Sequence, residues 1–375
     1  MNAGPRLELL SGNRLLAQGA LDAGCRFFSG YPITPSSEIY ETMMKELPAR
    51  NGLALAAPDE ITALAECVGA SLSGHKAMTA TSGPGWCLMI ETVQYAVMTE
   101  TPVVIALVQR LGPSTGGATQ GAQGDILLTE FCTSGGYRLP VFAPATARQC
   151  HEVAQAAFHW SERLRTPVVI LSDKEVGMTF ESVDFSSLEK WPPVERKAFT
   201  GSGEKFLTYA CDCVEEPPEF APVGGSARVV ATGSAHDRAG RLRKNIPEVI
   251  ELLRHLQAKI DAYAEEMTLV EAEIVPSADT LIVSYGISAR AARAACRRMN
   301  REGRRVSFLQ LLTLFPIPVE AIRRAGEGCS KVVVVEENMQ GLYASVLEPH
   351  IGRDRVVRVI GLGRMITPSE IAEAA

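Results

Sequence analysis

Ser29-Gly30-Tyr31-Pro32-Ile33-Thr34-Pro35-Ser36-Ser37 separates two segments of different periodicity. Upstream, Cys25-Arg26-Phe27-Phe28 is a short apolar run typical of a strand, and downstream residues 38–44 have helical character with an acid near the start. Thr34 and Pro35 predict a helix with Thr34 as N-cap and Pro35 as first helical residue. The unpaired N–H groups of such a helix N-terminus can receive a carboxylate or phosphate, although a capped helix start without a ligand is the alternative.

The composition indicates a soluble globular protein. Of its 375 residues, 46% are hydrophobic and 21% charged, and the net charge is −6. The length suits two domains with separate cores, and the acidic balance gives no nucleic-acid footprint. The first residues lack a signal-peptide core, and no window is apolar enough to span a membrane. We therefore expect a cytoplasmic protein with neither nucleic-acid nor membrane contacts.

The nine cysteines and six histidines form no clear metal motif. No C-x-x-C pair occurs, and most cysteines lie in apolar runs typical of reduced, buried thiols. Cys211-Asp212-Cys213 is the exception, for which a metal or redox role remains an alternative to a structural one. We expect no metal site, and no iron–sulfur cluster held by this chain alone.

Strands and helices alternate through the first half of the chain. Residues 102–108 are an almost continuous apolar run, typical of a strand buried on both faces of a parallel sheet. The repeated β-α pattern predicts a doubly wound α/β domain. Its other predicted elements are helices at 12–24, 88–98 and 147–160, a helix opened by Pro58-Asp59-Glu60, and strands at 53–57, 141–142 and 167–173.

The second half contains another α/β unit after a connecting region. Residues 180–226 are rich in Pro, Glu and Gly and lack periodicity. We predict domains at 1–200 and 273–375, joined by a segment at 201–272. The predicted elements here are strands at 228–232, 280–285, 305–309, 331–336 and 356–360, a long charged helix at 237–271 and a helix at 289–300.

One acid in the helix after Pro58 is expected to point inward. An apolar stripe at helical spacing contains Ile61, Leu64, Ala65, Val68 and Leu72. At about 100° per residue, Glu60 lies at the edge of this stripe and Glu66 falls on the solvated side. Glu60 is therefore a candidate functional carboxylate, and the alternative is a first-turn acid that complements the helix dipole.

Two further loops have features of a binding site. Met78-Thr79-Ala80-Thr81-Ser82-Gly83-Pro84-Gly85 is small-sided, so a ligand could approach its backbone closely, although a tight turn needs the same glycines. Arg110 follows the 102–108 strand at its carboxyl end, where ligands bind in open α/β sheets. Residues 112–125 are glycine-rich but match neither a Walker A motif nor a dinucleotide fingerprint, so we interpret them as a mobile site loop.

Five motifs occur in a specific order and spacing. They are Gly30–Ser37, Asp59-Glu60-Ile61, Met78–Gly85, Gln109-Arg110 with Gly112–Gly116, and Gly361–Pro368. Together they resemble the alpha subunit of the 2-oxoacid:ferredoxin oxidoreductases, most closely the 2-oxoglutarate type, over nearly the whole chain. The resemblance implies an N-terminal domain that binds the pyrimidine of thiamine diphosphate and a C-terminal transketolase-C-like domain.

The resemblance also implies roles for single residues. Glu60 matches the family's glutamate, whose carboxylate is hydrogen-bonded to pyrimidine N1′ and promotes deprotonation of the thiazolium carbon that attacks the 2-oxoacid. Thr34 matches a threonine that touches the substrate. Arg110 matches an arginine that pairs with the substrate carboxylate, for which a bidentate guanidinium is suited. The further cofactor contacts expected from the matching motifs are Tyr31, Pro32, Ile33, Ser82 and Gly83.

The missing motifs predict a partner. The Gly-Asp-Gly signature for diphosphate and Mg²⁺ does not occur, and Gly124-Asp125 lacks the rest of it. By resemblance, a beta subunit would hold the diphosphate, Mg²⁺ and a [4Fe-4S] cluster, with gamma and delta subunits as further candidates, coenzyme A as acyl acceptor and ferredoxin as electron acceptor. Relatives often show His-Gly-Asp where this chain has the segment 132–138. A branched-chain or aromatic 2-oxoacid, or a non-catalytic scaffold, therefore remain alternatives.

Overall fold

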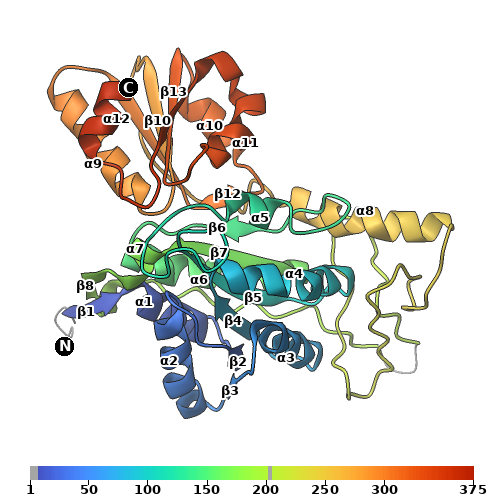
Figure 1. Ribbon diagram of the computed structural model, residues 1–375. Helices are drawn as coiled ribbons and strands as arrows, with labels where there is room; N and C mark the ends of the chain where they lie inside the picture. Colours follow the sequence, from blue (N-terminus) through green and yellow to red (C-terminus); the bar gives the residue numbers. More distant parts are fainter. Residues whose placement is uncertain (1–6, 202–204) are drawn as a thin grey trace, which may run out of the picture.

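The computed structural model describes residues 7–201 and 205–375, which form two α/β units and a two-stranded ribbon (Figure 1). The larger unit, drawn in blue to green except for the orange β12, contains a seven-stranded sheet in the order β12-β6-β7-β5-β4-β2-β3. All its neighbouring strands are parallel except β12, which is antiparallel to β6. Its strands are β2 (Phe27–Gly30), β3 (Leu53–Ala56), β4 (Ala77–Thr81), β5 (Val103–Gln109), β6 (Val141–Phe142), β7 (Pro167–Asp173) and β12 (Thr313–Phe315).

Helices cover both faces of this sheet because its central strand is apolar on both sides. Alternate β5 residues enter different cores: Val104 packs with α1, α2 and α6, whereas Ile105 packs with α3 and α4. All seven residues of β5 are buried, as the continuous apolar run predicts. The helices are α1 (Gly12–Asp22), α2 (Ser37–Glu46), α3 (Glu60–Leu72), α4 (Gly83–Met98) and α6 (Ala147–Leu164).

The smaller unit, drawn in orange and red, is a five-stranded sheet in the order β14-β13-β10-β11-β9 (Figure 1). One face shares an apolar core with α3 and α4 of the larger unit, and the other packs against α9 and α12. Its elements are β9 (Val270–Glu273), β10 (Thr280–Ser284), α9 (Ser288–Arg301), β11 (Val306–Leu311), α10 (Val319–Ala325), β13 (Lys331–Glu336), α11 (Leu342–Ile351), β14 (Val356–Ile360) and α12 (Pro368–Ala374).

Short elements complete the described chain. β1 (Leu7–Ser11) and β8 (Phe180–Asp184) pair antiparallel, so the predicted connecting region begins with a strand. α5 (Ile126–Glu130) and α7 (Lys174–Met178) follow the loops at the carboxyl edge of the large sheet. Single 3₁₀ turns occur at Pro48–Arg50, Phe185–Ser187 and Arg353–Arg355.

Two predicted elements in the connecting segment are wrong. Residues 228–232 form no strand, because the Val230 N–H donates to the Thr208 hydroxyl (3.1 Å) rather than to a neighbouring strand. The helix predicted at 237–271 is only α8 (Pro247–Asp261). Residues 237–241 form a turn instead, in which the Asp237 carboxylate accepts the N–H of Arg241 at 3.0 Å. Charge and length suggested one helix, but the local turn at Asp237 replaces its first part, and β9 begins at Val270 near its predicted end.

A buried ion pair and a buried hydrogen bond hold α8 against the larger unit. Lys259 Nζ and His255 Nε2 lie 2.6 and 2.9 Å from Glu100 Oε2, and all three side chains are buried. Burial alone would raise the pKa of Glu100, but the charge of Lys259 and the hydrogen bond from His255 keep it well below its usual range. The predicted domain bounds at residues 200 and 272 stay a prediction.

Candidate functional site

The order of the parallel strands determines where the candidate site lies. The chain passes from β2 to its neighbour β3 and then returns to β4 on the other side of β2. Such a reversal leaves a crevice at the carboxyl ends of the strands, where α/β proteins bind ligands. Thr34 follows β2, Glu60 follows β3, Ser82 follows β4 and Arg110 follows β5. All the sequence-predicted site residues therefore leave one edge of one sheet.

The segment after β2 forms a turn, so the predicted cap at Thr34 is wrong. The Ile33 carbonyl accepts the Ser36 N–H at 2.9 Å, which closes a turn with Thr34 and Pro35 at its centre. The Thr34–Pro35 peptide bond is cis. Residues at the centre of a turn are not helical, and α2 begins only at Ser37, with Ser36 as N-cap.

One side of this turn is bonded to α1, and the other side is exposed. The Asn13 side-chain amide donates to the Pro35 carbonyl at 2.9 Å, which ties the turn to the start of α1. Pro35 is buried, whereas Tyr31, Pro32 and Thr34 are exposed and Ile33 is half-buried. Since it caps nothing, the Thr34 hydroxyl is available to a ligand.

Arg110 and Thr34, both candidate site residues from the sequence, lie together. Arg110 Nη1 donates to the backbone carbonyl of Thr34 at 2.7 Å, across 76 positions of the chain. The arginine is 7% exposed, and its Nε has no hydrogen-bond partner among residues 7–201 and 205–375. A buried guanidinium with an unused donor is costly unless something pairs with it. Arg110 is therefore positioned to receive an anion.

Glu60 lies on the buried face of α3, more deeply than the predicted stripe implies. Asp59 caps the helix by accepting the Thr62 N–H at 2.7 Å, which places Glu60 in the first turn. Its side chain is 6% exposed and makes no hydrogen bond to any residue the structure describes. Gly85 leaves room for it, because a Cβ there would lie 2.6 Å from Glu60 Cγ.

The stripe used to orient α3 is partly wrong. Ile61 and Ala65 are exposed, and the buried face is instead Glu60, Ala63, Leu64, Cys67, Val68 and Ser71. Glu66, expected in solvent, is half-buried and accepts a hydrogen bond of 2.6 Å from Ser29 Oγ. Leu64 and Val68 of this face belong to the apolar core between α3, α4 and the sheet.

The glycine-rich segment after β4 is a helix start rather than a separate turn. Gly83-Pro84-Gly85 forms the first turn of α4, with Ser82 as N-cap and Pro84 near the start. The Ser82 hydroxyl is fully buried and has no partner among the described residues. Ser82 and Gly83, predicted as ligand contacts, thus present a free hydroxyl and the positive end of a helix.

Asp125 lies beside this helix start and is not among the site residues predicted from the sequence. A Cβ on Gly83 would lie 3.0 Å from each Asp125 carboxylate oxygen, so this carboxylate covers the start of α4. Its backbone N–H donates to the Gln109 side chain at 3.0 Å, and its Oδ2 is buried without a partner among the described residues. Burial raises the pKa of Asp125 to about 6, against the opposing charge of Arg110. Its place immediately before the apolar turn of α5 was the signal that could have identified it.

Gln123 ties the loop after Arg110 to the smaller unit. Its side-chain amide donates to Asp173 Oδ2 (3.0 Å) and to the Tyr285 carbonyl (3.1 Å). Its side-chain oxygen accepts the Glu337 N–H at 2.8 Å and the Ser288 hydroxyl at 3.1 Å. The end of the loop predicted to be mobile is thus held by a buried network.

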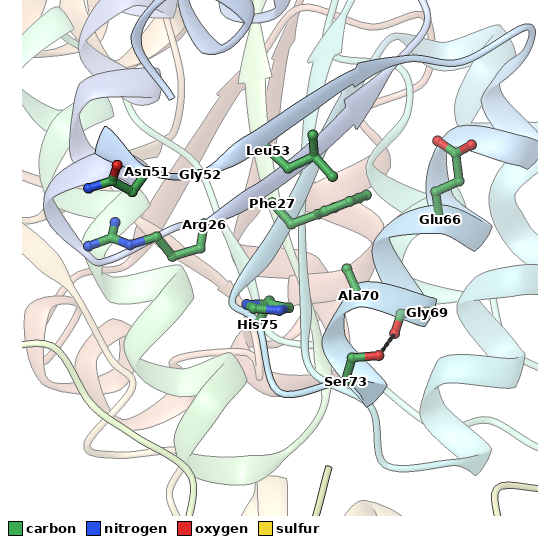
Figure 2. A pocket seen from close by; sticks show the side chains of 10 residues that line it. All are labelled: Arg26, Phe27, Asn51, Gly52, Leu53, Glu66, Gly69, Ala70, Ser73 and His75. Carbon is green, nitrogen blue, oxygen red and sulfur yellow. Dashed lines mark hydrogen bonds between the residues drawn. The ribbon is translucent and has the colours of Figure 1, made fainter. Parts of the chain in front are cut away.

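A cavity of about 640 Å³ lies elsewhere on the larger unit (Figure 2). It is lined by Arg26 and Leu53, near the amino ends of β2 and β3, by Glu66 and Gly69 of α3, and by Ser73, which follows that helix. The candidate site leaves the carboxyl ends of the same strands. This cavity is therefore separate from Thr34, Glu60 and Arg110.

Most cysteines are buried, as predicted. Cys87 and Cys213 are exposed and Cys211 is half-buried, while the other six are buried. Within residues 7–201 and 205–375, no group of three or more His, Cys, Asp or Glu side chains could hold a metal ion. Of the helices in this described part, none has the length and apolar character that crossing a membrane requires.

Comparisons with known proteins match almost the entire chain. The family model described as "Pyruvate flavodoxin/ferredoxin oxidoreductase, thiamine diP-bdg" matches residues 18–255, and "Pyruvate:ferredoxin oxidoreductase core domain II" matches residues 278–371. The 2-oxoglutarate synthase subunit KorA of Methanothermobacter marburgensis is 38% identical over 366 residues, covering 96% of each chain.

Solved structures similar to this chain belong to the same family or share its fold. A 2-oxoglutarate:ferredoxin oxidoreductase from Magnetococcus marinus, with 2-oxoglutarate, coenzyme A and succinyl-CoA bound, has a TM-score of 0.92 at 30% identity. The alignment covers 98% of this chain but 64% of that longer chain. A split-gene transketolase has a TM-score of 0.57 at 16% identity, which shows a shared fold alone. The predicted class of two α/β domains, one of them a thiamine-binding type, is confirmed.

Proposed function

Because this chain belongs to the 2-oxoacid:ferredoxin oxidoreductase family, we propose that it is the alpha subunit of a 2-oxoglutarate:ferredoxin oxidoreductase. The complete enzyme would convert 2-oxoglutarate and coenzyme A to succinyl-CoA and CO₂ and pass two electrons to ferredoxin. The observation that carries the proposal is the Glu60 carboxylate, which is buried at the same sheet edge as the Arg110–Thr34 pair and has no hydrogen bond to any residue that the structure describes.

The residues present fit the pyrimidine half of thiamine diphosphate. A ring nitrogen needs a buried carboxylate as its partner, and Glu60 is buried without a hydrogen bond to any described residue. Because Gly85 has no side chain, nothing at that position covers the Glu60 carboxylate. The Ser82 hydroxyl, without a partner among the described residues, offers the ring a second polar contact. When bound, thiamine diphosphate supplies the nucleophilic carbon and the electron sink for decarboxylation.

Each predicted residue has a role that its position supports. Glu60 would accept a hydrogen bond from the pyrimidine ring and control its protonation. Arg110 would pair with the 2-oxoacid carboxylate through the donors that Thr34 leaves unused. Thr34 would contact the substrate with its exposed hydroxyl. Additional cofactor contacts are proposed for Tyr31, Pro32, Ile33, Ser82 and Gly83.

A partner subunit would complete the site. The similar protein from Methanothermobacter marburgensis is itself named a subunit, and this chain spans 64% of the solved homologue's chain. We place the diphosphate contacts, Mg²⁺ and a [4Fe-4S] cluster in a beta subunit, with gamma and delta subunits and ferredoxin as further partners. A cytoplasmic location is part of the same proposal.

The departure at residues 132–138 gives little reason to prefer another 2-oxoacid. The Ser134 N–H donates to Gln94 of α4, and the Arg138 N–H donates to Gln257 of α8, at 3.0 and 2.8 Å. Arg138 also pairs with Glu130 at 3.1 Å. These contacts support a structural role for the segment, and 2-oxoglutarate remains the preferred substrate.

The proposal is tested on the complex purified with its native beta subunit. We expect coenzyme-A-dependent decarboxylation of 2-oxoglutarate, and a loss of about 10²-fold or more in kcat for Glu60→Gln, which keeps the shape but not the charge. Glu66→Gln is the matched control, because it changes a half-buried carboxylate of the same helix. Full activity of Glu60→Gln would contradict the assignment of Glu60. A preference for a branched-chain or aromatic substrate would contradict only the choice of 2-oxoglutarate.

A further inference from the structure

Gln123 uses every one of its polar groups in a hydrogen bond. Besides the four bonds of its side chain, its N–H donates to the Glu337 carbonyl at 2.6 Å, and its carbonyl accepts the Asn338 side-chain amide at 3.2 Å. The residue is 0% exposed, so these six bonds are shielded from water. A buried polar group with all its partners present is held rigidly. Gln123 is therefore a fixed point in the loop that follows Arg110.

The partners of Gln123 come from both α/β units. Five of the six bonds reach the smaller unit, and the sixth reaches Asp173 at the end of β7. The partners in the smaller unit follow strands β10 and β13 in the chain, and they are Tyr285, Ser288, Glu337 and Asn338. The carboxyl ends of strands from the two sheets thus meet at Gln123.

The residues on either side of Arg110 are bonded to the same loop. The Leu111 N–H donates to the Gln120 carbonyl at 2.8 Å. The side-chain oxygen of Gln109 accepts the Asp125 N–H at 3.0 Å, and Gln109 is itself buried. Because both chain neighbours of Arg110 are tied to the loop, the position of the loop determines where the arginine backbone lies.

The Gly361–Pro368 motif, to which the proposed function gives no role, also contacts this loop. A Cβ on Gly363 would lie 3.5 Å from Leu111 Cδ2, so the two segments are in ordinary contact distance. The Ile366 N–H donates to Glu337 Oε1 at 3.2 Å. Glu337 is the residue whose backbone is bonded to the loop. The motif therefore supports the loop both directly and through Glu337.

We propose that Gln123 is a positioning residue for Arg110: it fixes the loop beside this arginine against the smaller unit, so that the guanidinium is held where it can pair with the carboxylate of the 2-oxoacid. This inference rests on the proposed function, and it adds a residue outside the site and a role for the smaller unit. Gln123 has no polar group left for a substrate, so it acts only through Arg110.

The test is KM for 2-oxoglutarate in the complex with the beta subunit. Gln123→Ala removes the side-chain bonds, and we expect KM to rise by about five- to tenfold, as for a weakened hydrogen bond to a charged group, with a smaller change in kcat. Gln123→Glu has nearly the same size and loses only the two bonds that the amide donates, to Asp173 and Tyr285. It should raise KM by about threefold, and it serves as the test if the Gln123→Ala complex does not assemble.

Gln149→Ala is the matched control for a loss of stability. Gln149 of α6 is also a buried glutamine that joins the two units. Its amide donates to Glu271 at 2.6 Å, and its oxygen accepts the Gln310 amide at 2.8 Å. These partners lie on β9 and β11 and not in the loop beside Arg110. Gln149→Ala should lower Tm as Gln123→Ala does, but leave KM for 2-oxoglutarate unchanged.

A double-variant cycle shows whether Gln123 acts through Arg110. In an Arg110→Lys background the guanidinium that Gln123 positions is absent, so Gln123→Ala should raise KM by less than about twofold. A purely structural role of Gln123 would give the same rise in both backgrounds, and that result would overturn the inference.

The other outcomes are also distinct. A native complex without turnover of any 2-oxoacid would overturn the proposed function, and the inference with it. An active native complex whose KM is unchanged in both Gln123 variants, or rises equally in Gln149→Ala, would overturn the inference alone. A rise of KM that is confined to the Gln123 variants and depends on Arg110 would establish it.

Discussion

Adding one methyl group at Gly85 should displace Glu60 without removing it. A Cβ at this position would lie 2.6 Å from Glu60 Cγ and 2.7 Å from Glu60 Oε1, and would also overlap Thr81 Oγ1. Ordinary contact begins at 3.4 Å, so the Glu60 side chain must move by about 0.7–0.8 Å. Misplacement of a catalytic group by about 1 Å can reduce the rate by about 10²-fold. We therefore expect Gly85→Ala to lower kcat by about that factor.

The assay must distinguish displacement of the Glu60 side chain from unfolding of the Gly85→Ala variant. Overpacking costs about 1–3 kcal/mol, which urea denaturation of the variant measures directly. Gly69→Ala is the control, because Gly69 lies on the exposed side of α3 beside the cavity of Figure 2 and an added Cβ there meets no atom within 4 Å. It should gain about 0.5–1 kcal/mol from helix propensity and keep its activity. A folded Gly85→Ala complex with kcat within about threefold of the native value would refute the role of the Glu60 position.

Three further changes test other parts of the structure. Arg110→Lys keeps the charge but loses the fork that contacts Thr34 and is proposed to pair with the substrate carboxylate, so KM for 2-oxoglutarate should rise by about tenfold or more, with a smaller change in kcat. Gln123→Ala leaves the buried Glu337 N–H and Asp173 short of partners, and urea denaturation should show a loss of about 2–4 kcal/mol. Burial alone would raise the pKa of Asp22, but the hydrogen bond with His151 and the charge of Lys190 lower it to about 2. This carboxylate stabilises the fold fully above pH 4 and loses that effect as the pH falls through 2, so Asp22→Asn should cost about 2 kcal/mol at pH 7 and progressively less in acid.

The alternation of elements was predictable because it depends on local patterns. The continuous apolar run of β5 implied a strand buried on both faces, and both cores indeed use it. The carboxyl-edge position of Arg110 followed from that strand alone. The predictions were wrong where a local turn formed in place of a regular element. At Asp237, for example, a side-chain hydrogen bond closes a turn where charge and length had predicted the start of a helix, and α8 begins only at Pro247.

How the candidate site residues are brought together could be learned only from the tertiary structure. Motif spacing identified Thr34, Glu60 and Arg110 as candidates, but only the strand order β3-β2-β4-β5 gathers the four loops at one edge. The contact of Arg110 with Thr34 uses the backbone carbonyl, which no side-chain pattern encodes. The sequence did not reveal that the Asp125 carboxylate lies over the start of α4, or that its Oδ2 has no partner among the described residues.

The sequence by itself thus determined most of the alternation of strands and helices outside the connecting segment, the family, and which residues are candidates for the site, because these depend on periodicity and motif spacing. Only the tertiary structure decided that Thr34 lies in a turn rather than at a cap, and which side of α3 is buried. It also decided which polar groups remain without partners. Those properties depend on contacts between residues far apart in the chain, and a one-dimensional pattern does not contain them.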